Sequence, residues 1–205
     1  METLLIKKAD FLPYRNISAN INEAKQLDSF ILEAQRLDLI GLLGRKLYHK
    51  IISVYTTYLE RLAANATYIS TTEEKSFIDL IRGKKYTDSD QNDINYLGLI
   101  PVLVYLTYAR FIRSSHLQST ATGFVRKTHE FAEAISSKEI QEQASRAETD
   151  ASAFLNFVFE YLGENMETFK DYVNVTDNAC IGSTDLRRIG TRLRSVRGKS
   201  ITQRK

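Results

Sequence analysis

The chain has 205 residues, of which 43% are hydrophobic and 26% are charged, ordinary values for a globular protein. A core of this size folds without disulfides or a structural metal, and the single cysteine, Cys180, excludes an internal disulfide. No uncharged apolar run is long enough for a membrane-spanning helix, and the first residues lack the pattern of a secretory signal.

The net charge of +3 is distributed unevenly along the chain. Residues 185–205 hold eight of the 28 cations and one of the 25 anions, an excess of +7, which leaves −4 for residues 1–184. We therefore expect a mildly acidic body over residues 1–176 and a basic tail over residues 177–205. A strongly basic tail is typical of a segment that binds a partner.

The chain contains few residues that interrupt helices, since it has nine glycines and two prolines. Apolar residues at helical spacing predict five helices, over about 20–40, 45–64, 72–82, 97–111 and 137–163. Asn20 followed by Glu23 resembles a capping box for the first of them, and Gly41 and Gly44 predict a short break after it.

Two segments do not follow the helical pattern. Residues 84–96 read as two short strands around a polar turn, which predicts a small β-hairpin. Residues 114–136 have no helical period, and a coil of this length in a compact domain is often functional. The predicted fold class is therefore all-α: a helical bundle of about five helices with a short β-hairpin, a long coil and a basic C-terminal tail.

The fifth helix has the clearest pattern, because its apolar residues alternate at spacings of four and three, as in a heptad seam. The seam contains three alanines that allow close backbone approach near one end, and larger side chains near the other. Its members are Ile140, Ala144, Ala147, Ala151, Phe154, Val158 and Tyr161.

No group of residues in the sequence indicates catalysis or a cofactor. None of the three histidines has a second ligand at metal-binding spacing. The series Asp88, Asp90 and Asn92 matches the start of a calcium loop, but Asp93 stands where glycine is required and Leu99 where glutamate is required. The sequence therefore predicts a polar turn there, no cofactor, no metal site and no enzymatic activity.

Two segments are candidates for contact with partners. The first lies within the predicted coil, with Phe124 as an apolar anchor beside Val125, Arg126 and Lys127. The second is in the tail, where apolar and basic residues alternate at helical spacing; we select Leu186, Arg187, Arg188, Ile189, Arg192, Leu193, Arg194 and Arg197. The tail could bind an acidic protein surface or DNA phosphates, or act only as a solubilising terminus.

Four segments carry a resemblance to a known family: Leu39–Tyr48, Leu80–Asp88, Gly98–Arg110 and Ser119–Lys127. In that order they resemble head–tail connector proteins, also called adaptor or ring proteins, of tailed phages that infect Bacteroidetes, including the crAss-like phages. The resemblance covers about residues 25–172 and does not include the basic tail.

The resemblance implies a structural virion protein rather than an enzyme. Such an α-helical adaptor assembles as a ring of twelve copies beneath the portal, joins the capsid to the tail and extends the DNA channel. The implied partners are other copies of the chain, the portal protein and neighbouring tail or ring proteins, with genomic DNA passing through the channel and no membrane. The implied location is the head–tail junction of the virion, after synthesis in the host cytoplasm.

The alternative is a soluble helical protein that binds DNA through the basic tail. If all eight cations neutralised phosphates, the logarithm of the binding constant would fall with the logarithm of salt concentration at a slope of roughly −7. Contact with a protein partner would depend less steeply on salt. We expect the tail to prefer a protein partner, because DNA must slide through a connector channel.

Overall fold

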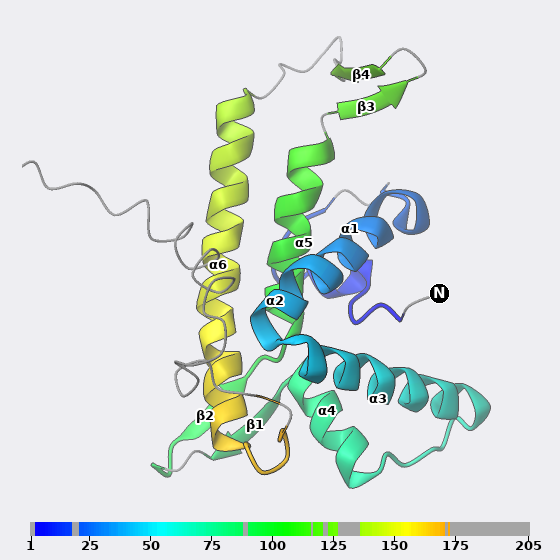
Figure 1. The fold of residues 1–205 in the computed structure, drawn as a ribbon, viewed down its shortest axis with the longest axis vertical. Helices are drawn as coiled ribbons and strands as arrows, with labels where there is room; N and C mark the ends of the chain where they lie inside the picture. The colour runs from blue at the N-terminus through cyan, green and yellow to red at the C-terminus, as the bar shows by residue number, and fades with distance from the viewer. Residues whose placement is uncertain are drawn as a thin grey trace, which may run out of the picture. The chain divides into compact units, whose positions relative to one another are not determined.

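The computed structural model describes residues 3–17, 21–87, 90–115, 117–120, 123–126, 136–170 and 172 (Figure 1). For Ala24, Lys25, Ser115 and the two strands at 117–126, only the backbone is described. These residues belong to one compact unit, Met1–Tyr172, and the expected boundary after residue 176 lies outside the described residues.

The described chain is mostly helical, as the sequence predicts, with two short hairpins. The helical elements in chain order are a 3-10 turn η1 (Lys8–Phe11), a π-helical turn η2 (Glu23–Leu27), α1 (Asp28–Glu33), a second π-helical turn η3 (Ala34–Leu39), α2 (Ile40–Leu43), α3 (Arg45–Ala64), α4 (Thr72–Arg82), α5 (Ile100–Ser115) and α6 (Ser137–Glu164). The strands are β1 (Lys84–Thr87), β2 (Asp93–Tyr96), β3 (Leu117–Thr120) and β4 (Gly123–Arg126).

The predicted helices at 45–64, 72–82 and 137–163 are confirmed as α3, α4 and α6, within a residue at each end. Two of these helices begin at capping boxes. The Thr71 hydroxyl accepts from the Glu74 N–H at 3.2 Å, and the Glu74 carboxylate accepts from the Thr71 N–H at 2.8 Å. Ser136 and Glu139 form the same reciprocal pair before α6. Capping satisfies N–H groups that have no partner within the helix.

The first predicted helix differs from expectation in its course. It continues past residue 40 to Leu43 through two π-helical turns, and Gly41 lies inside it rather than at a break. Gly44 ends it, with a φ of +82° that suits glycine. The predicted cap, Asn20, lies outside the described residues.

The hairpin predicted over 84–96 is confirmed, with β1 and β2 antiparallel and Lys84 opposite Tyr96. The coil predicted over 114–136 is wrong in part. Helix α5 continues to Ser115, and β3 pairs with β4 as a second antiparallel hairpin, with Ser119 opposite Phe124. Short strands with few apolar residues give only a weak sequence pattern, so the sequence alone does not predict this hairpin.

Helix α5 forms the centre of the core, as its continuous apolar sequence predicts. Val102, Leu103 and Val104 on successive positions are all fully buried. Helix α6 packs antiparallel along α5, and α3 packs against α4 (Figure 1). All members of the predicted α6 seam are buried except Ile140 and Phe154, which are half-buried.

The N-terminal segment, for which the sequence predicted no element, is part of this core. Leu5, Ile6 and Phe11 are fully buried. Gln35 in η3 is also fully buried, and its amide accepts from the Leu5 N–H at 2.8 Å and donates to the Thr3 carbonyl at 3.2 Å. A buried amide needs such partners, and here it ties the segment to the helices.

Candidate functional site

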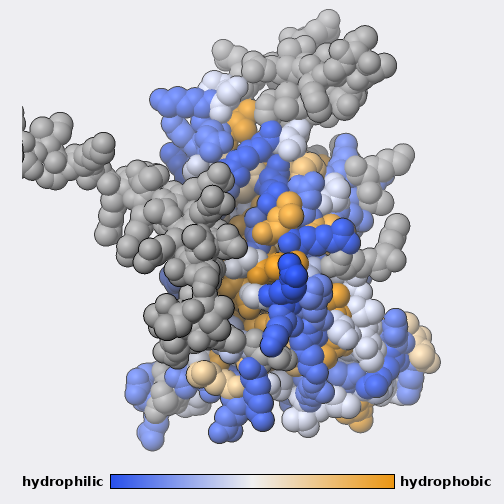
Figure 2. All heavy atoms as spheres, viewed as in Figure 1, coloured by the Kyte–Doolittle hydropathy of each residue, from blue (hydrophilic) through white to orange (hydrophobic). Residues whose placement is uncertain are grey.

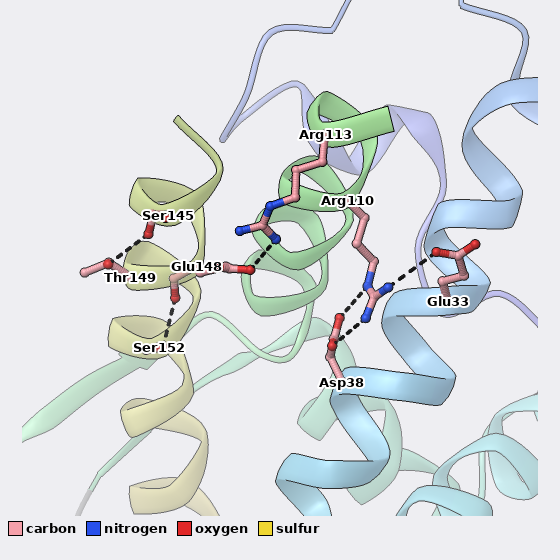
Figure 3. Close-up of polar contacts among 8 residues, drawn as sticks. All are labelled: Glu33, Asp38, Arg110, Arg113, Ser145, Glu148, Thr149 and Ser152. Atoms are coloured by element: carbon pink, nitrogen blue, oxygen red, sulfur yellow. Dashed lines mark hydrogen bonds and ion pairs between the residues drawn. The ribbon is translucent and has the colours of Figure 1, made fainter. Parts of the chain in front are cut away.

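The carboxyl end of α5 is held by ion pairs on two sides (Figure 3). On one side, Arg110 donates to both carboxylate oxygens of Asp38 in η3, each at 2.7 Å, and to Glu33 in α1 at 3.4 Å. Planar two-point contacts of this kind combine charge with fixed geometry. The hydrogen bond to Asp38 raises the pKa of Arg110, so the guanidinium remains charged.

On the other side, Arg113 pairs with Glu148 of α6 (Figure 3). Both arginines lie toward the carboxyl end of α5, where the helix dipole favours cations. Their carboxylate partners are 35 to 77 positions away in the chain, and only the packing of α5 between α1–η3 and α6 brings them together. The last turns of α5 are thereby fixed to two neighbouring helices.

The β3–β4 hairpin follows this clamped end directly, and Figure 1 shows it beyond the last turn of α5. Three of the four residues selected in the predicted coil, Phe124, Val125 and Arg126, lie on strand β4. Lys127 lies outside the described residues. The structure therefore places this candidate segment on a hairpin rather than on a coil.

The selected tail residues all lie outside the described residues: Leu186, Arg187, Arg188, Ile189, Arg192, Leu193, Arg194 and Arg197. Their assignment remains a prediction from the charge and spacing of the sequence.

An aromatic cluster holds the carboxyl end of α6 against the first hairpin. Tyr161 stacks on Tyr96 with ring centroids 4.3 Å apart, and Phe169 meets Phe77 edge-on at 5.3 Å. Burial raises the pKa of Tyr96 well above its ordinary value and also raises that of Tyr161, so both phenols remain neutral. This cluster packs one side of the helix end firmly.

The opposite side of the same helix end is an exposed surface that the sequence analysis did not select. Phe157 is 53% exposed and Met166 is 47% exposed. The acidic residues Glu160 and Glu164 lie between them in sequence, and Glu167 follows Met166. Phe157 is an apolar residue of α6 that lies outside the heptad seam. This position relative to the seam is the sequence signal that could have identified it as exposed. On the face shown in Figure 2, the described surface is mostly hydrophilic, and hydrophobic residues show only in small areas.

The described residues contain no group of three or more histidine, cysteine, aspartate or glutamate side chains arranged to hold a metal ion. In the same part of the chain, no helix combines the length and the apolar character needed to cross a membrane.

The model of one protein family matches residues 39–181, which is more than half of the chain. The chain belongs to the DUF6712 family. This family is described as one of unknown function, so membership assigns no activity. The DUF6712 match begins at the last residue of η3, whereas Leu5, Ile6 and Phe11 also belong to the core of this protein. Neither a curated protein nor a solved structure matches the chain.

Proposed function

We propose that this DUF6712 protein is a structural virion protein, a connector that forms a ring between the portal and the tail and extends the DNA channel. The observation that carries the proposal is the β3–β4 hairpin, which pairs within itself beyond the clamped end of α5. A hairpin on a fixed base is suited to reach a neighbouring copy. Residues of both strands of this hairpin also belong to the fourth segment of the resemblance, Ser119–Lys127, whose last residue on a strand is Arg126.

The arrangement of the other resembling segments supports the proposal. Gly83 of the second segment and Gly98 of the third approach each other so closely that a side chain on either would meet the other's backbone. The first segment forms the corner from η3 to α3 around Gly44. The resemblance therefore falls on three corners of the body and on the projecting hairpin, which are the parts that set the shape of a subunit.

The proposed assembly contains twelve copies and binds the portal protein and neighbouring tail or ring proteins. Genomic DNA passes through its channel. The assembly is located at the head–tail junction of the virion, after synthesis of the chain in the host cytoplasm. A ring closes through heterologous contacts, in which one surface of a subunit binds a different surface of the next. A projecting hairpin provides one half of such a contact.

The test is ring formation by the purified full-length chain, alone and with its portal protein, measured by light scattering after size exclusion and by electron microscopy. Phe124→Asp is expected to reduce the ring fraction at least tenfold, because an aspartate cannot fill an apolar contact. Leu12→Asp is the matched control, since Leu12 is 74% exposed on the body and should leave rings intact. Rings that form equally well with Phe124→Asp would contradict the assigned role of the hairpin, and virions that lack the chain at the head–tail junction would contradict the function.

The second candidate function is DNA binding through the tail, and the +7 excess of residues 185–205 favours it. A DNA-binding protein would act as a monomer or dimer and would bind duplex DNA with the steep salt dependence of about −7. A connector would form rings, and the contact of its tail with a protein partner would depend less steeply on salt. The two functions are separated by measuring the salt slope and the oligomeric state on the same preparation.

A further inference from the structure

The carboxyl end of α6 exposes one continuous helical face. Ala153, Phe157, Glu160 and Glu164 are all exposed and follow one another at spacings of four, three and four residues. Met166 and Glu167 are exposed directly after the helix ends. We call these six residues the α6 terminal face. It combines two large apolar side chains with three carboxylates.

Two carboxylates of this face differ from three acidic residues nearer the start of α6. Glu142, Glu148 and Asp150 each pair with a cation of the body. Glu160 and Glu167, however, have no ion pair within the part of the chain that the structure describes.

The helix itself makes this placement of acids unfavourable. The last turn of α6 contains no basic residue, and the carboxyl end of a helix carries partial negative charge that favours cations. Carboxylates at this position are therefore best compensated by a basic partner.

The chain contains a segment with the complementary pattern. Between Leu186 and Arg197, five arginines alternate with Leu186, Ile189, Leu193 and Val196 at helical spacing. The described chain ends at Tyr172, whose ring stacks on Phe159 of α6 at 6.3 Å. Thirteen residues separate Tyr172 from Leu186, which is enough to span up to about 45 Å. A connection of this length allows the basic segment to reach the same face on an adjacent subunit.

We propose that the α6 terminal face is the docking site for residues 186–197 of a neighbouring copy. Phe157 and Met166 receive the apolar side of the segment, and Glu160, Glu164 and Glu167 pair with its arginines. This inference rests on the proposed ring, because a tail bound to the next subunit is a heterologous contact that links copies around a ring.

The test uses two full-length chains in a Cys180→Ser background. One carries Ala153→Cys, on the face but not among the proposed contacts, and the other carries Ile189→Cys. After mixing under ring-forming conditions, a short bismaleimide is expected to join 153 to 189 with at least tenfold higher yield than it joins 189 to a cysteine at Leu12. Because each chain has one cysteine, every such product is formed between copies.

Charge exchange tests the specificity of the contact. Glu160→Lys combined with Glu167→Lys is expected to reduce the 153–189 yield at least fivefold, and Arg192→Glu with Arg194→Glu on the other chain is expected to restore it. Glu60→Lys is the matched control, since Glu60 is exposed on α3, and it should leave the yield unchanged.

The proposal would be overturned if the cysteine at 189 joined to a cysteine at 153 and to one at Leu12 with equal yield. It would also be overturned if a chain that carries cysteines at both 153 and 189 cross-linked only within itself. Protection of the cysteine at 189 by duplex DNA, without cross-linking to 153, would also overturn it and assign the segment to DNA. Light scattering on the same samples separates the two proposals. Rings without the cross-link refute only the docking site, whereas the cross-link in open dimers supports docking and refutes the ring.

Discussion

Gly83 and Gly98 at the base of the β1–β2 hairpin show how single residues determine a local structure. Both have positive φ, +85° and +79°, a region that side chains other than glycine rarely adopt. A methyl group on Gly98 would overlap the carbonyl oxygen of Ile81. The Leu99 N–H lies beside them and donates to Ile81 O at 3.0 Å, so α5 starts where the two glycines meet.

Gly98→Ala is therefore expected to destabilise the protein by at least about 2 kcal/mol, since strained φ and a backbone overlap add together. The matched control is Gly163→Ala in α6, where the added methyl group meets no atom and φ is not positive. That change should be neutral or stabilise the protein by up to about 1 kcal/mol, because alanine favours helix. Unfolding by denaturant measures both, and equal midpoints for the two variants would contradict this account.

The packing of α5 against α6 depends on small residues at one end and aromatic residues at the other. Ala109 of α5 and Ala144 and Ala147 of α6 form a small buried cluster, which lets the helices approach closely near the ion pair of Arg113. Further along, Phe154 stacks on Tyr105 with ring centroids 5.6 Å apart. The alternation of small and large residues sets how the two helices lie against each other.

Replacement of Ala147 by leucine is expected to cost about 1–3 kcal/mol, because the extra carbons have no space between the helices. Ala153→Leu on the exposed face of the same helix should change stability by less than about 0.5 kcal/mol. Thermal unfolding followed by circular dichroism compares them. If Ala147→Leu melted at the temperature of the unchanged protein, the close approach of α5 and α6 would be wrong.

The N-terminal segment connects several elements of the body and is part of the same core. Arg15 pairs with Asp150 of α6 at 2.8 Å, and Arg82 of α4 pairs with Asp10 at 3.1 Å. Phe11 lies between Asp10 and Arg15 in the sequence, and its side chain is fully buried. The segment precedes the part of the chain that the DUF6712 family model matches, yet it completes the core of that part.

Phe11→Ala is expected to destabilise the whole protein by about 3–5 kcal/mol rather than to release the segment alone, because its ring is buried in the common core. Leu12→Ala, one residue away and exposed, should have an effect below about 0.5 kcal/mol. Tyrosine fluorescence and far-ultraviolet circular dichroism should report the same lowered midpoint for Phe11→Ala. A midpoint lowered in only one of the two signals would show that the segment unfolds separately.

Local patterns were sufficient to predict α3, α4, α6 and the first hairpin, because helical spacing, capping residues and polar turns act within a few positions of the chain. Thr71 with Glu74, and Gly83 after the helix, mark α4 in the sequence and in the structure alike. The seam of α6 also predicted which of its positions are buried, with Ile140 and Phe154 only half-buried.

Long-range packing determined the remaining features. Sequence periodicity gives no partner for Arg110, because Asp38 is 72 positions away and is brought into place only by the packing of η3 on α5. The same holds for Gln35, whose hydrogen bonds to the N-terminal segment exist only once that segment lies in the core. The α6 terminal face was missed for the converse reason. Phe157 lies outside the heptad seam, but its exposure depends on the tertiary structure, because no described element packs on that side of the helix.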